Sequence, residues 1–204
     1  MDKKSYIKEV LRPLSEHLRL GSKVNEVGTQ LIGHVPHVAP KAYFHVIYAP
    51  LKDEELKALE TNLDRSLPIQ FKHFLSFANG LDIYSGYLSV LGFVPHKRKA
   101  EVHPHNYPGN ILVSNVQGRI RGLKHNSVIV GFYKFDGSYV CVEESGKVFR
   151  FDANGDGKTI QEWPSFDTWI IFEIKYLRKC FDEAGKLKGD IEKVFGRKRA
   201  QKVV

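Results

Sequence analysis

Residues 51–80, LKDEELKALETNLDRSLPIQFKHFLSFANG, decide the fold class of this chain. They predict two consecutive helices, separated at Leu67-Pro68 and followed by Asn79-Gly80. Pro68 suits the first position of the second helix, where its missing N–H costs nothing. Gly80 can adopt the left-handed conformation that ends a helix. None of these side chains is chemically reactive, so the segment indicates a scaffold rather than an active site. The apolar stripe expected along the second helix consists of Phe71, Phe74, Leu75 and Ala78.

The composition is that of a folded globular protein. The chain has 204 residues, of which 42% are hydrophobic and 12% aromatic, enough for one substantial core. Its formal net charge is +8 and its pI about 9.4. A basic balance favours an acidic partner, which can be nucleic acid, an anionic membrane or an acidic protein. The charge alone does not choose among them.

The cysteines and the apolar runs indicate the compartment. Cys141 and Cys180 lie far apart in apolar patterns, so we expect buried free thiols in a reducing cytosol. The N-terminus lacks the apolar run of a signal peptide, and no apolar stretch approaches the length that spans a bilayer. We therefore expect a cytoplasmic protein without a membrane partner.

The segments around the helix pair predict a sheet flanked by helices. Residues 4–20 predict a helix interrupted at Pro13 and ended by Gly21, and residues 21–40 are expected to be irregular apart from one strand. Residues 94–110 read as a long exposed loop. The hairpin turns are expected at Asp136-Gly137 and Ser145-Gly146. Strands are predicted at residues 43–48, 88–94, 111–116, 127–133, 139–143 and 148–152.

The longest predicted helix closes the sheet. Ser165 suits its N-cap, and the helix is expected to run over residues 165–184 and end at Gly185. Trp163 is assigned to the core rather than to an exposed interface anchor. The sequence thus predicts an α+β fold with a mostly antiparallel sheet, a meander, packed against helices. Its core spans 41–185, with an N-terminal helical extension 1–40 and a basic C-terminal tail 186–204. The apolar stripe of the helix consists of Phe166, Trp169, Ile170, Ile174, Leu177 and Phe181.

The order and spacing of these signals resemble the SUKH superfamily, the Smi/Knr-like proteins, over roughly residues 45–185. This resemblance implies an α+β fold and no shared catalytic apparatus. It also implies an immunity protein of a bacterial toxin system, which binds and neutralises a cognate toxin, frequently a nuclease. Since the chain is basic, such an inhibitor suits an acidic toxin or an acidic face of one. The matching residues are Leu56, Leu59-Glu60, Leu67-Pro68, Phe71, Phe74-Leu75, Asn79-Gly80, Ile129, Gly131, Asp136-Gly137, Val140, Val148-Phe149, Ser165-Phe166 and Trp169.

Two motifs offer metal ligands without completing a site. Residues 152–157 copy the start of a calcium loop, but Trp163 stands where a bidentate glutamate is required, so a polar hairpin turn is the better interpretation. His103 and His105 have a spacing that zinc can use, yet no cysteine pair accompanies them. The sequence therefore predicts neither a metal nor another cofactor.

The remaining hypotheses concern binding. The common catalytic motifs, such as the P-loop and HExxH, are absent from the sequence, and we predict no enzyme activity. A protein toxin or toxin domain is the expected partner. A basic nucleic-acid-associated protein, or a cell-wall or signalling regulator built on the same module, stays an alternative. The partner-binding residues, chosen for charge and exposure, are Lys97, Arg98, Lys99, His103, His105, Tyr107, Arg119 and Arg121.

Overall fold

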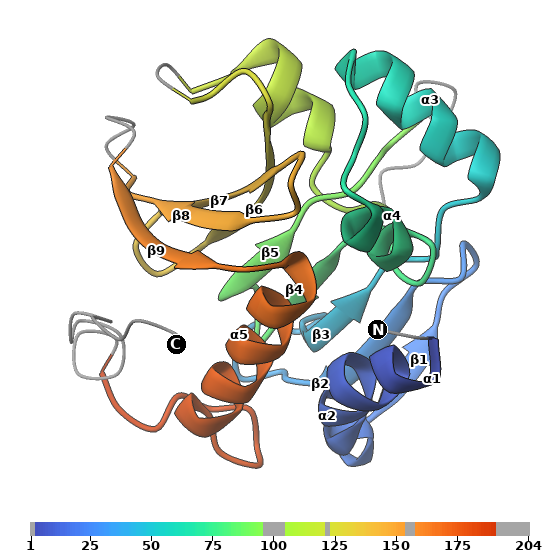
Figure 1. Cartoon of the computed structure of the whole chain (residues 1–204). Coiled ribbons are helices and arrows are strands. Elements are labelled where there is room, and N and C mark those ends of the chain that lie inside the picture. The colour runs from blue at the N-terminus through green and yellow to red at the C-terminus, as the bar shows by residue number, and fades with distance from the viewer. Residues whose placement is uncertain (1–2, 96–104, 121–122, 154–157, 191–204) are drawn as a thin grey trace.

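The computed structural model describes residues 3–95, 105–120, 123–153 and 158–190. In this part of the chain, nine strands form one antiparallel sheet whose spatial order equals the chain order (Figure 1). The predicted α+β meander is therefore confirmed. The strands are β1 (Ser22–Val24), β2 (Gln30–His34), β3 (Tyr43–Ile47), β4 (Leu81–Ile83), β5 (Leu88–Val90), β6 (Ser127–Tyr133), β7 (Tyr139–Glu143), β8 (Val148–Phe151) and β9 (Thr159–Trp163).

Helices precede, interrupt and close the sheet. The connection from β3 to β4 contains α3 (Asp53–Leu63) and α4 (Ile69–Leu75), and α5 (Phe166–Cys180) follows β9. Figure 1 shows α4 and α5 lying across the same side of the sheet, with α2 near α5. No helix among the described residues is both long enough and apolar enough to cross a bilayer. The N-terminal helical segment consists of α1 (Lys3–Tyr6), the π-helical η1 (Ile7–Leu11), α2 (Arg12–Ser15) and the 3-10 helix η2 (Glu16–Leu20).

The two helices predicted from residues 51–80 are present, with shifted ends. Pro68 is the N-cap of α4 rather than its first residue, with φ −56° and ψ 141°. The helix ends at Leu75, so Gly80 does not terminate it. Gly80 does adopt the expected left-handed backbone, with φ +97°, and a Cβ there would lie 2.6 Å from the Val90 carbonyl oxygen. The glycine is therefore required for the close approach of the chain to β5.

The Asn79 side chain clamps this turn to the chain that leaves β5. Its Nδ2 donates to the Phe93 carbonyl at 2.7 Å, and the Phe93 N–H donates to its Oδ1 at 2.7 Å. A Cβ on Gly92 would lie 2.2 Å from the Asn79 carbonyl oxygen, so the crossing leaves no room for a side chain there. Asn79 is buried, and both the nitrogen and the oxygen of its side-chain amide hold the two segments together.

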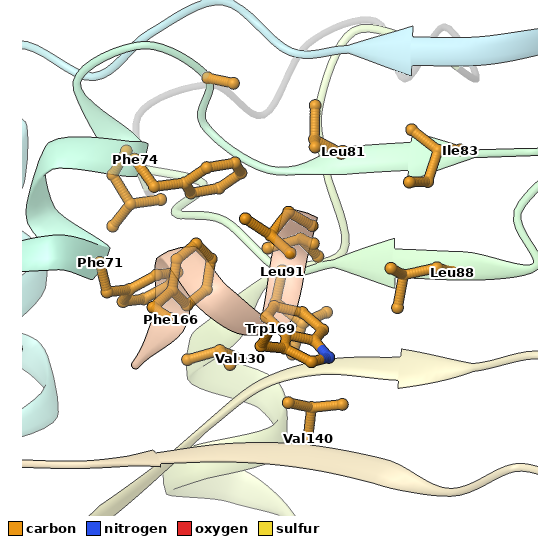
Figure 2. Close-up of a cluster of buried hydrophobic side chains, with 14 of the residues drawn as sticks. Phe71, Phe74, Leu81, Ile83, Leu88, Leu91, Val130, Val140, Phe166 and Trp169 are labelled. Atoms are coloured by element: carbon orange, nitrogen blue, oxygen red, sulfur yellow. The ribbon is translucent and has the colours of Figure 1, made fainter. Parts of the chain in front are cut away.

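Aromatic rings from α4 and α5 pack against each other over the sheet. Figure 2 shows Phe71 and Phe74 facing Phe166, with Trp169 above the strands. The Phe166 ring centroid lies 5.0 Å from that of Phe71 and 5.1 Å from that of Phe74. The stripe predicted for the closing helix is buried throughout, and Trp163, 1% exposed, belongs to the core as predicted. Cys141 and Cys180 are free and buried, also as predicted.

The predicted strand at residues 111–116 is wrong, because this segment is helical and contains the π turn η3 (Val113–Gln117). Buried Asn115 explains the difference. Its Nδ2 donates to the carbonyls of Ile111 and Ile129, and its Oδ1 accepts from the Ile129 N–H. The side chain thus satisfies both backbone groups of Ile129 in β6, next to the bulge between Ile129 and Gly131.

Three further predictions need correction. Residues 21–40 contain two strands, β1 and β2, and the strands β4 and β9 were not predicted. The closing helix ends at Cys180 rather than at residue 184, because Phe181 is extended with φ −115° and ψ 151°. The N-terminal helix, in contrast, is divided at Pro13 and ends at Gly21, both as predicted, because a new helical piece, α2, begins at Arg12 with Pro13 in its first turn.

Candidate functional site

A polar hollow of about 380 Å³ lies between the N-terminal helical segment and the end of α5. Its walls come from η2, from the last turn of α5, and from the segment after α5, which the bridge between Phe181 and Leu187 folds back on itself. The lining residues are Glu16, His17, Arg19, Arg178, Phe181, Asp182, Glu183 and Lys188.

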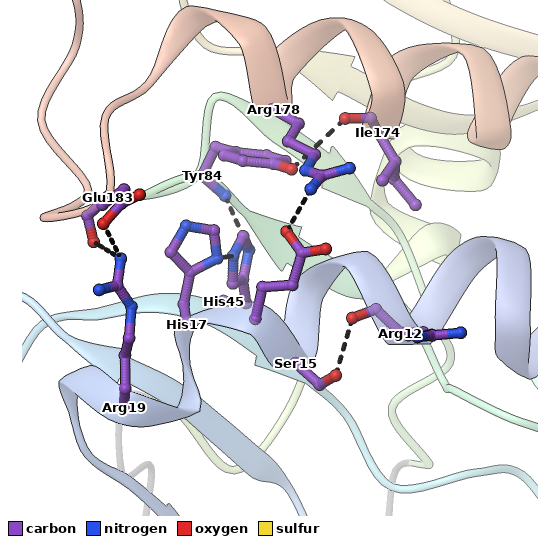
Figure 3. Close-up of polar contacts among 10 residues, drawn as sticks. Arg12, Ser15, His17, Arg19, His45, Tyr84, Ile174, Arg178 and Glu183 are labelled. Atoms are coloured by element: carbon purple, nitrogen blue, oxygen red, sulfur yellow. Dashed lines mark hydrogen bonds and ion pairs between the residues drawn. The ribbon is translucent and has the colours of Figure 1, made fainter.

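A pair of buried histidines lies behind this hollow (Figure 3). His45 Nε2 and His17 Nδ1 are 3.1 Å apart, and the Tyr84 N–H donates to His45 Nδ1 at 3.3 Å. Since His45 Nδ1 accepts a hydrogen bond, a neutral His45 carries its proton on Nε2 and donates it to His17. This network connects the N-terminal segment, strand β3 and the turn after β4.

Burial keeps both imidazoles neutral. His45 is fully buried, and this desolvation, assisted by the neighbouring His17, holds its pKa well below the ordinary value. Burial also lowers the pKa of His17, although nearby Glu16 acts in the opposite direction. The adjoining turn is conformationally unusual, because Tyr84 and Ser85 have φ of 53° and 57° without being glycine.

Two ion pairs flank the entrance of the hollow. Arg19 Nη2 lies 2.8 Å from Glu183 Oε2, and Arg178 Nη2 lies 2.8 Å from Glu16 Oε2. Their carboxylates are thus paired with guanidinium groups, and Nδ1 of His17 is occupied by His45. Within the described residues, no group of three or more His, Cys, Asp or Glu side chains could hold a metal ion. The arrangement is that of a joint between chain segments.

The histidine pair predicts acid sensitivity. In the unfolded chain each histidine takes up a proton as the pH falls through about 6.5, whereas the folded protein resists protonation because both pKa values are lowered. The free energy of unfolding is therefore highest above about pH 6.5. It falls as the pH decreases from this value toward the lowered pKa values of the two histidines in the folded protein. The slope is up to about 1.4 kcal/mol per pH unit for each histidine.

Chemical denaturation at about pH 7.5 and about pH 5.5 measures this effect. We expect His17→Gln/His45→Gln to flatten the pH dependence, and the matched variant of exposed His125 (His125→Gln) to retain it. A wild-type protein with the same unfolding free energy at both pH values would contradict the assignment.

The structure describes only some of the predicted partner-binding residues. Lys97, Arg98, Lys99, His103 and Arg121 lie outside the described residues, as does most of the loop at 152–157. The three that it describes are not gathered at one place. His105 Nε2 lies 3.2 Å from the Lys41 carbonyl oxygen, and its ring contacts that of Tyr43 in β3. Tyr107 is half-buried. Arg119 follows η3, and its guanidinium donates to the Ser127 carbonyl at the start of β6.

The guanidinium group of Arg119 lies beside that of Arg65, which is not among the predicted partner-binding residues. Arg65 Nη1 and Arg119 Nη2 each donate to the Ser127 carbonyl oxygen at 3.0 Å. Burial lowers the pKa of Arg119, and the charge of Arg65 lowers it further. Among the described residues, Arg119 Nη1 is buried without a hydrogen-bond partner, and no carboxylate forms an ion pair with either guanidinium. Both groups also donate to other backbone carbonyls, Arg65 to that of His125 and Arg119 to that of Lys124. Their charges are thus held by the backbone and can attract an oxyanion.

Comparison with known proteins identifies the fold family. Residues 50–171 match the SMI1 / KNR4 family (SUKH-1). The chain belongs to this family. The SUKH-1 match contains α3, α4, the strands β4 to β9 and the beginning of α5. The resemblance seen in the sequence is thereby confirmed.

A solved structure resembles this SUKH-1 protein over part of its length. It is the crystal structure of a protein from Pseudomonas syringae pv. tomato, with 21% identity and a TM-score of 0.45. The likeness covers 60% of this chain and 81% of the other. No curated protein matches the sequence.

The family boundary separates the two candidate sites. Arg65 and Arg119 lie inside the SUKH-1 match, whereas every residue that lines the polar hollow lies outside it. The histidine joint therefore attaches the flanking segments of this chain to the family core. The arginine pair is formed by the family core itself.

Proposed function

We propose that this SUKH-1 protein is a non-enzymatic immunity protein that binds a cognate toxin in the bacterial cytoplasm and covers its active site. The family match over residues 50–171 carries the proposal, because membership fits a protein-binding module of the immunity type. The ion-paired side chains around the polar hollow agree with it, since those groups hold chain segments together.

The arginine pair indicates where a toxin carboxylate would dock. Two guanidinium groups share one carbonyl acceptor, and an approaching Asp or Glu would neutralise their charge. Charge-assisted hydrogen bonds contribute about 1.5–3 kcal/mol each. The positive net charge of +8 would assist the encounter with an acidic face of the toxin.

The test uses a toxin domain encoded next to the gene for this protein, and the absence of any such reading frame would itself count against the proposal. Co-expression with this protein should restore growth, and titration should inhibit the purified domain at a one-to-one ratio. A toxin domain that keeps its activity in excess of this protein would contradict the proposal. A gel shift with steep loss of binding between low and physiological salt would instead support the nucleic-acid alternative.

The contribution of the arginine pair can be measured separately. We expect Arg65→Ala to weaken toxin binding about tenfold or more, because a partly buried charge contact is lost. Lys57→Ala, an exposed charge on α3, should change the dissociation constant less than about twofold. Isothermal titration gives both values, and thermal unfolding shows whether Arg65→Ala stays folded. If Arg65→Ala and Lys57→Ala were both folded and bound the toxin with equal affinity, the docking surface would lie elsewhere.

A further inference from the structure

An apolar groove of about 500 Å³ lies between the N-terminal helical segment and the strands β2 and β3. Ile32 and Ile47, each 4% exposed, line its inner part, and Ile7 and Leu11 line its helical wall. Ile7 is 44% exposed, which is high for an isoleucine beside a groove. Figure 1 shows the helical wall, α1 and α2, beside β1 and β2.

The rim of this groove is basic. Lys4, Lys8 and Arg12 line it at intervals of four residues, which corresponds to about one helical turn. All three are exposed, and among the described residues none of them forms an ion pair. Of the residues that the structure describes, no acidic side chain lines the groove.

The carboxylates of the same segment are used elsewhere. Glu9 Oε2 lies 3.4 Å from Lys175 Nζ, and Glu16 Oε2 lies 2.8 Å from Arg178 Nη2, so both are paired with α5. Figure 3 shows Arg12 directed away from the ion pair of Arg178. The acidic groups of the N-terminal segment are thus paired with α5. Lys8 and Arg12 also line a second hollow, which contains Glu9 and Glu16, but the ion pairs of both carboxylates are formed with α5, and the groove side presents the cations above apolar residues.

We propose that this groove binds an acidic amphipathic helix of a partner protein. Apolar side chains of that helix would contact Ile7, Ile32 and Ile47, while Asp or Glu residues spaced one turn apart would face the three cations. The basic rim requires a partner helix that carries negative charge. The apolar lining requires that one face of this helix be apolar. The groove lies wholly outside the family match at 50–171, and the inference does not require that the partner be a toxin.

The shape of the groove favours a peptide over a membrane surface. A basic amphipathic helix also attracts anionic lipids, but two of the apolar residues here are almost completely buried below the basic rim. A flat bilayer would meet Ile7 and the cations without reaching Ile32 or Ile47. A helix with protruding side chains can reach both levels.

Selection of random peptides displayed on phage against the purified full chain tests this inference. We expect enriched sequences with Asp or Glu and large apolar residues at helical spacing. A labelled synthetic copy of the strongest sequence, measured by fluorescence anisotropy, should lose about tenfold or more in affinity for Lys8→Glu/Arg12→Glu. Ile7→Ser should also weaken binding, because apolar contact is lost.

The matched control removes the same positive charge from other helices. Lys57→Glu/Lys179→Glu changes two exposed lysines on α3 and α5, and we expect it to keep the affinity within about twofold. Enriched peptides without acidic residues, or no enrichment at all, would overturn the proposal. An equal loss of peptide affinity in the control variant would also overturn it. So would charge-dependent binding of the protein to phosphatidylserine vesicles, if the same protein did not bind the acidic peptide.

Discussion

Replacement of Asn79 by alanine is expected to lower the free energy of unfolding by about 2–6 kcal/mol. The side chain satisfies both the N–H and the carbonyl of Phe93, at 2.7 Å each. Removal of the amide leaves two buried backbone groups without partners, and each such group costs about 1–3 kcal/mol. Equilibrium denaturation in urea measures the difference.

Asn62 provides the matched control for this experiment. Its amide also bonds to a backbone carbonyl, that of Ala58 at 2.7 Å, but it lies on the exposed side of α3. We expect Asn62→Ala to change stability by less than about 0.5 kcal/mol. If both alanine variants were equally stable, Asn79 would not be acting as a clamp between the turn and the chain after β5.

Trp169→Ala is expected to destabilise the protein by about 3–5 kcal/mol, because it opens a cavity in the middle of the core. The indole is fully buried, its ring lies 5.2 Å from that of Phe166, and its Nε1 donates to Tyr133 Oη at 3.0 Å. Trp169→Phe should cost less than the alanine variant, since it retains part of the packing. Tyr133→Phe isolates the hydrogen bond, which is expected to contribute about 1 kcal/mol.

An exposed isoleucine is the reference for this series. Ile160 on β9 is 46% exposed, and Ile160→Ala should change the unfolding free energy by less than about 0.5 kcal/mol. Trp169→Ala at the same stability as Ile160→Ala would show that α5 does not depend on its central aromatic residue for its attachment to the sheet.

Elements with strong periodicity could be predicted from the sequence. The closing helix has a wide apolar stripe, and the strands β6 to β8 are separated by turns that contain glycine. The missed strands have weaker patterns. β1 is exposed along its whole length, and β4 has three residues directly after the Asn79-Gly80 turn. Residues 111–116 mislead because a short apolar run does not distinguish a strand from a helical turn. Only the contact of Asn115 with β6 decides between them.

The candidate sites depend on contacts between distant segments. His17 lies on a predicted helix and His45 in a predicted strand, and nothing in their spacing indicates that His17 Nδ1 and His45 Nε2 lie 3.1 Å apart. Arg119 could be selected for its charge, but Arg65 follows a helix as one ordinary basic residue. The sequence shows which residues are charged, whereas pairing across the fold decides which of them lack a counterion.

The strict chain order of the strands has a consequence for how the protein folds. Each ladder joins neighbours along the chain, so most pairings can close over short loops at a small entropic cost. Two ladders differ, because the helices α3 and α4 lie between β3 and β4, and the long segment 91–126 lies between β5 and β6. We therefore expect these two closures to limit the folding rate, and the bonds between Asn79 and Phe93 hold the two connections together once they have closed.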